Sequence, residues 1–90
     1  MTHFLVSEDN PAGHKLEDIL GQIRTDILRR CLKITDDHRP EAMKVLANNV
    51  TILEHLTEAI NLAMDSTRIL DRAFGPSQSE KGGPPRIGTA

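Results

Sequence analysis

Apolar residues recur every three or four positions in two stretches of the chain, and this spacing predicts two α-helices. A helix turns about 100° per residue, so residues three and four apart share one face. In the first stretch these residues are Leu16, Ile19, Leu20, Ile23, Ile27, Cys31 and Ile34. In the second they are Leu46, Asn49, Leu53, Leu56, Ile60, Ala63, Thr67, Leu70 and Phe74, whose alternating steps are typical of a coiled-coil seam.

Turn-forming residues indicate where the first helix begins. Asn10 is a favourable helix cap and Pro11 suits a first helical position, so this pair favours a helix start. Gly13 weakens that first turn, because glycine loses the most conformational freedom in a helix. The first helix is therefore predicted at residues 14–34, after an N-terminal arm at 1–13.

Similar signals indicate the end of the first helix and both ends of the second. Asp36 and Asp37 predict a turn at 35–39, and Pro40 is tolerated only in the first turn of a helix. The second helix is predicted at 40–74 and ends at Gly75 and Pro76. The helical domain then covers 14–75, and the Gly-, Pro- and Ser-rich tail at 76–90 is expected to be disordered.

The unequal helix lengths predict an uncovered apolar segment. A short connection sends the second helix back antiparallel to the first. With the bend at 35–39, Leu16 is expected opposite Ile60 and Ile23 opposite Leu53. The second helix then extends past Ala63 by about 12 residues, or about 18 Å.

Apolar residues on two sides of this extension indicate two neighbours, because Leu62 and Ile69 point away from the seam. A second copy of the chain is the simplest cover, since most small oligomers are symmetric homodimers. We therefore expect an all-α antiparallel helical hairpin with unequal helices that dimerises into a four-helix bundle. The residues expected to contact a second copy or another protein are Leu56, Ile60, Leu62, Ala63, Met64, Ile69, Leu70 and Phe74.

Charge gives a second hypothesis, association with nucleic acid. The formal net charge of −2 provides no general attraction to phosphates, but basic residues gather around the bend. Possible anion contacts are Arg24, Arg29, Arg30, Lys33, Arg39 and Lys44, among which Asp26, Asp36, Asp37 and Glu41 are interspersed. Nucleic acid is therefore the less favoured partner.

Individual polar residues suggest further roles. Asn49 occupies a seam position, where a polar side chain can fix the register or oligomeric state, unless the seam opens to water there. His55 permits a weaker hypothesis of histidine phosphotransfer, although the following residues 56–59 do not match the pattern of such modules. Cys31 has the position of a buried structural thiol. The four histidines lack the spacing of a metal site, so no metal or cofactor is expected.

Together these features favour a non-enzymatic protein–protein interaction or regulatory module that acts as a homodimer and binds an unidentified protein. A single cysteine and the lack of a signal-like apolar run are typical of the cytoplasm. No stretch approaches the roughly 18 apolar residues of a membrane span, so no membrane contact is expected.

Overall fold

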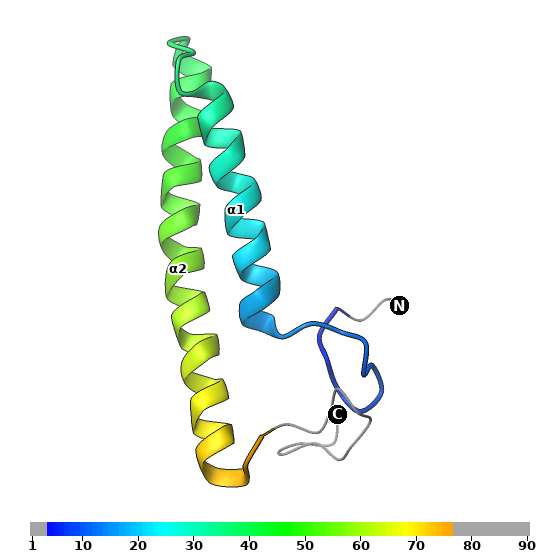
Figure 1. Cartoon of the computed structure of the whole chain (residues 1–90). Helices are drawn as coiled ribbons and strands as arrows, with labels where there is room; N and C mark the ends of the chain where they lie inside the picture. The colour runs from blue at the N-terminus through cyan, green and yellow to red at the C-terminus, as the bar shows by residue number, and fades with distance from the viewer. Residues whose placement is uncertain (1–3, 77–90) are drawn as a thin grey trace.

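The chain folds into two antiparallel α-helices that lie side by side as a hairpin (Figure 1). The computed structural model describes residues 4–76. Helix α1 spans Leu16–Ile34 and helix α2 spans Pro40–Phe74, with 19 and 35 residues. The predicted all-α hairpin with unequal helices is confirmed, whereas its dimerisation stays a prediction. The tail was predicted at 76–90, and from residue 77 on it lies outside the described residues.

The N-terminal arm, residues 4–15, folds back on itself and does not begin a helix at Asn10. The backbone groups of Ser7 and Asn10 exchange two hydrogen bonds, and the His14 N–H donates to the Phe4 carbonyl at 2.9 Å. The Asn10 side chain donates to the Leu5 carbonyl at 3.0 Å. The predicted cap role of Asn10 is therefore wrong, because its amide closes this arm. Helix α1 begins two residues later than predicted, at Leu16.

The bend between the helices is organised by Asp37. Its carboxylate accepts hydrogen bonds from the backbone N–H of Arg39 at 3.1 Å and from the Arg39 guanidinium. Its own N–H donates to the Ile34 carbonyl at 3.1 Å. An aspartate that binds the N–H two residues later forms a compact turn, and Pro40 then occupies the first turn of α2. The predicted break at 35–39 is confirmed.

The end of α2 also follows its local sequence. Gly75 has a positive φ of 78°, which a residue with a side chain rarely adopts, and its N–H donates to the Asp71 carbonyl at 2.9 Å. Pro76 follows directly. The predicted end at Gly75 is confirmed, because glycine accommodates this backbone conformation without steric cost.

The predicted seam of α2 faces α1 along nearly its whole length. Ile60 and Ala63 are the two buried apolar side chains among the described residues, with 7% and 8% of their surface exposed. The other half-buried seam residues are Leu46, Asn49, Leu53, Leu56, Thr67 and Leu70. Phe74, at the end of the seam, is 59% exposed. The core of the hairpin is therefore a single line of contact between two helices.

The inner face of α1 differs from the predicted stripe. Leu16 and Ile23 are 45% and 43% exposed, whereas Glu17 and Arg24 are half-buried and point to α2. Leu20, Ile27, Cys31 and Ile34 complete the half-buried line at steps of three and four. Glu17 and Arg24 can occupy it because their aliphatic stems cover apolar surface while their polar ends reach hydroxyl groups on α2.

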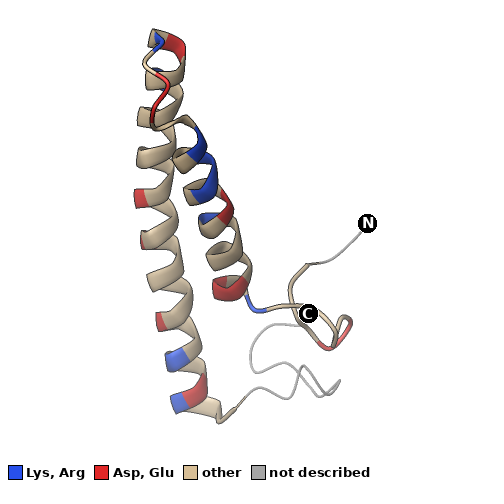
Figure 2. Ribbon diagram, turned by 45° about the horizontal axis from the view of Figure 1, so that its top comes forward, with Lys and Arg blue, Asp and Glu red and all other residues tan. Residues whose placement is uncertain are grey.

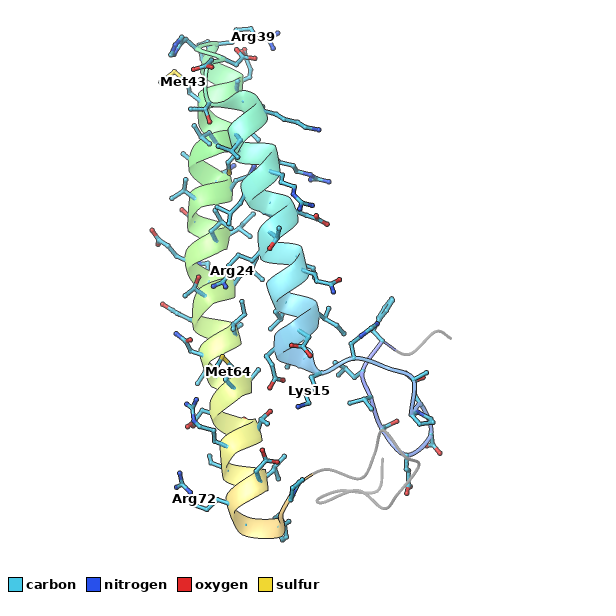
Figure 3. The ribbon with its side chains drawn as sticks, in the orientation of Figure 1. Lys15, Arg24, Arg39, Met43, Met64 and Arg72 are labelled. Carbon is cyan, nitrogen blue, oxygen red and sulfur yellow. The ribbon has the colours of Figure 1, made fainter. Side chains whose placement is uncertain are left out.

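Those two polar contacts also correct the predicted register. Arg24 Nη1 donates to Thr57 Oγ1 at 3.3 Å, and Thr67 Oγ1 donates to Glu17 Oε2 at 2.8 Å (Figure 3). With Leu16 opposite Ile60, Glu17 would lie about eight residues, or about 12 Å, from the level of Thr67. Helix α1 therefore lies further toward the C-terminal end of α2 than predicted. Contacts from α1 therefore reach Thr67, four residues beyond Ala63, through a side chain that leans toward the N-terminus of its helix.

The hairpin is elongated. Its radius of gyration is 17.2 Å, compared with roughly 12 Å for a compact domain of this length. An elongated molecule of two helices has no interior beyond the line where the helices touch, which explains why few side chains are buried.

Candidate interaction surface

The residues predicted at a protein interface fall into two groups. Ile60 and Ala63 are buried against α1, and Leu56 and Leu70 are half-buried, so the hairpin itself uses much of their surface. Four others are well exposed on α2: Leu62, Met64, Ile69 and Phe74. This exposed group has the larger apolar surface available to a second molecule.

A second line of residues on α2 runs parallel to the seam at the same alternating spacing. We call it the second seam, and it consists of Val45, Asn48, Ile52, His55, Ala59, Leu62, Ser66, Ile69 and Ala73. Its large apolar members are exposed: Val45 by 50%, Ile52 by 43%, Leu62 by 69% and Ile69 by 55%. Each of its members directly precedes a residue of the line that faces α1, so at 100° per residue the two lines lie about 100° apart around the helix. Helix α2 thus has two coiled-coil faces, of which α1 covers one.

Helix α1 adds apolar residues beside the second seam. Leu16, Ile19 and Ile23 each directly precede an inward-facing residue of α1. In the same way, each second-seam residue directly precedes a residue of the α2 seam. When two helices run antiparallel, corresponding flanks lie on the same side of the pair. Leu16 and Ile23 therefore widen the second seam at the open end of the hairpin, whereas nearer the bend the same flank of α1 carries Asp26, Arg30 and Lys33. We call this combined surface the flank face. The sequence pattern alone did not reveal this face, because Leu16 and Ile23 were expected in the core.

The opposite side of the hairpin is less continuous. It carries Met43, Val50 and Met64 of α2, with Leu28 and Leu32 of α1. The hydrogen bond between Arg24 and Thr57 interrupts this side at its middle, where Figure 3 shows Arg24 extending from α1 across α2. A polar pair in the centre makes it the weaker of the two candidate surfaces.

Asn49 occupies the half-buried position that its place in the seam predicted. Its side chain makes no hydrogen bond within residues 4–76. A half-exposed amide can bind water, so the structure is compatible with either predicted role of Asn49, in register or in a seam that opens near the bend.

The basic residues around the bend are partly neutralised by acidic neighbours (Figure 2). Arg29 lies 3.6 Å from Asp26, Arg39 forms an ion pair with Asp37, and Arg24 is bound to Thr57. The Arg39 guanidinium and backbone N–H hold the pKa of Asp37 below its usual value of 3.8. Within the described chain, Arg30, Lys33 and Lys44 have no ion-pair or hydrogen-bond partner for their side chains, so only these three are available to an anion.

The residues considered for chemistry are not brought together. His55 is exposed on the second seam, and Cys31 is half-buried in the inner face of α1. A shallow polar hollow on α1 is lined by His14, Glu17, Asp18, Gly21, Gln22, Thr25, Asp26 and Arg29. Within residues 4–76, no three His, Cys, Asp or Glu side chains are grouped so that they could hold a metal ion.

Neither helix of the described chain is long and apolar enough to cross a membrane. No protein-family model matches this sequence, and no curated protein or solved structure is significantly similar to it. The interpretation of function therefore rests on the hairpin and its exposed faces alone.

Proposed function

We propose that this protein is a non-enzymatic helical interaction module that acts as a homodimer and binds and regulates another protein. The observation that supports it is the imbalance between buried and exposed apolar surface. The described chain buries two apolar side chains, yet fourteen large apolar residues are exposed. Monomeric proteins rarely expose such large contiguous apolar patches, whereas interaction surfaces commonly do.

The first test is the mass of the protein in solution. We expect light scattering to give twice the chain mass of 10.0 kDa, that is about 20 kDa, over about a hundredfold range of concentration. A mass of one chain throughout that range would contradict the proposal. Binding to a separate protein partner is then tested with the intact dimer.

Arg30, Lys33 and Lys44 support a second candidate function, contact with nucleic acid at the bend. If these three residues neutralise phosphates, the logarithm of affinity should fall by about 2.7 per tenfold rise in salt for each bound hairpin. Gel shifts of a variant that combines Arg30→Gln, Lys33→Gln and Lys44→Gln should then show loss of binding. Arg29→Gln is the matched control, because Arg29 already pairs with Asp26. Binding that is insensitive to salt would contradict this function.

A further inference from the structure

We propose that the homodimer forms when a second copy lies antiparallel on the flank face, with a two-fold axis at the level of Thr57. In this arrangement, the second seams of the two α2 helices form the centre of a four-helix bundle. The inference rests on the proposed homodimeric function and adds the face, orientation and register of the contact.

The residues of the second seam match themselves in one antiparallel register. With the axis at Thr57, Val45 lies opposite Ile69 of the other copy and Ile52 opposite Leu62. Polar Asn48 lies opposite Ser66, and bulky His55 opposite small Ala59. A shift of one heptad in either direction would place Asn48 opposite Ala59 or Ala73 and remove one of the large apolar pairs. One register therefore pairs the large apolar residues with each other and Asn48 with Ser66, and His55 opposite Ala59 is its one polar–apolar pair.

The charges of the hairpin favour the same orientation. The half between the axis and the bend, residues 24–56, has six basic and five acidic side chains. The open half, residues 15–23 and 57–74, has three basic and five acidic ones. An antiparallel dimer places each net positive half beside the partner's net negative half, whereas a parallel dimer places like charges together.

The area of the flank face is sufficient for a stable dimer. The second seam from Val45 to Ile69 is about 36 Å long at the helical rise, and two helices side by side are about 20 Å wide. Their product is roughly 700 Å² per copy, close to the roughly 800 Å² that each partner buries in a typical specific complex.

Disulfide trapping tests both orientation and register. In a Cys31→Ser background, Ile52→Cys and Leu62→Cys are prepared separately, one with an affinity tag so that a mixed dimer is recognised by its mass. The antiparallel register brings residue 52 of one copy opposite residue 62 of the other, but separates like residues by about 15 Å. We expect mild oxidation to cross-link the mixture and neither variant alone.

A charged residue introduced on each face tests which face forms the dimer. Leu62 is exposed in the hairpin, so Leu62→Glu removes no contact within one chain and should dissociate the dimer, and the helix content by circular dichroism should fall as the partner is lost. Leu32→Glu is the matched control, because Leu32 is 76% exposed on the other side and should leave the dimer intact.

The outcomes separate this inference from the proposed function. A monomeric mass of the unmodified protein would overturn both. If the mass is that of a dimer, three results would overturn the antiparallel flank-face dimer alone. These are self-cross-linking of either single variant, the absence of a mixed cross-link, and dissociation by Leu32→Glu but not by Leu62→Glu.

Discussion

Among single residues, the glycines of the described chain have different structural roles. A Cβ at Gly13 would lie 2.6 Å from the carbonyl carbon and oxygen of Leu5, so this glycine permits the close approach within the arm. Gly75 provides the positive φ that ends α2. Gly21 has neither role, because a Cβ there meets nothing within 4 Å. It therefore weakens α1 without a compensating contact in the hairpin.

Gly21→Ala should stabilise the protein by about 0.5–1 kcal/mol, because alanine loses less backbone freedom than glycine in a helix. Thermal unfolding followed by circular dichroism should show a midpoint higher by roughly 2–8 °C. Gly75→Ala is the opposite control and should lower the midpoint, since its φ of 78° is unfavourable for alanine. A lower midpoint for Gly21→Ala would indicate that another molecule packs against this position.

The bend should contribute a pH-dependent part of the stability through Asp37. Arg39 stabilises the charged carboxylate and lowers the pKa of Asp37 below 3.8 in the folded state. A group with a lowered folded pKa adds stability above its unfolded pKa and loses it as the pH falls through the folded value. The difference in melting temperature between the natural protein and Asp37→Asn should therefore shrink when the pH is lowered from about 6 to about 2.

Asp36→Asn is the matched control for this measurement, because the Asp36 side chain makes no hydrogen bond to Arg39. The difference in melting temperature between Asp36→Asn and the natural protein should not shrink in this way as the pH is lowered. If the effect of Asp37→Asn is the same at all these pH values, Arg39 does not bind the carboxylate in solution.

Among whole elements, α2 could be predicted from sequence more fully than α1. Pro40 and Gly75 are strong local signals, and the bounds of α2 agree with the prediction at both ends. Asn10 was ambiguous, because its side-chain oxygen can accept from the N–H groups of a helix start, whereas its Nδ2 can donate to a carbonyl, as it does to that of Leu5. The inner face of α1 could not be found locally, because Glu17 and Arg24 turn inward only when Thr67 and Thr57 are placed beside them.

The contact between Glu17 and Thr67 is one of two side-chain hydrogen bonds that join the helices of the described chain, and it can be tested by substitution. Thr67→Val removes the hydroxyl and leaves the part-buried Glu17 carboxylate without this donor, so it should cost about 1 kcal/mol. Thr51→Val is the matched control, because the Thr51 hydroxyl binds only the Ala47 carbonyl of its own helix. The two variants should be compared by urea unfolding. Equal effects would contradict a stabilising hydrogen bond between Thr67 and Glu17.

At the scale of the whole molecule, the sequence predicted an exposed apolar surface but located it incompletely. The prediction concentrated on the uncovered end of α2, where Leu62, Ile69 and Phe74 are indeed exposed. The exposure of Val45 and Ile52 could not be judged before α1 was known to cover only one side of α2. A narrow helix pair therefore leaves a candidate surface along its full length, and not only at its longer end.

The small core of the hairpin leads to a prediction about the stability of the whole molecule. With two buried apolar side chains in each described chain, most of the apolar burial must come from dimerisation if the dimer forms. Unfolding is then coupled to dissociation, and each tenfold rise in concentration should stabilise the dimer by about 1.4 kcal/mol. Thermal unfolding over about a hundredfold range of concentration should show a steadily rising midpoint, and Leu62→Glu should abolish the rise. A midpoint independent of concentration in the natural protein would mean that the hairpin is stable alone, despite its exposed flank face.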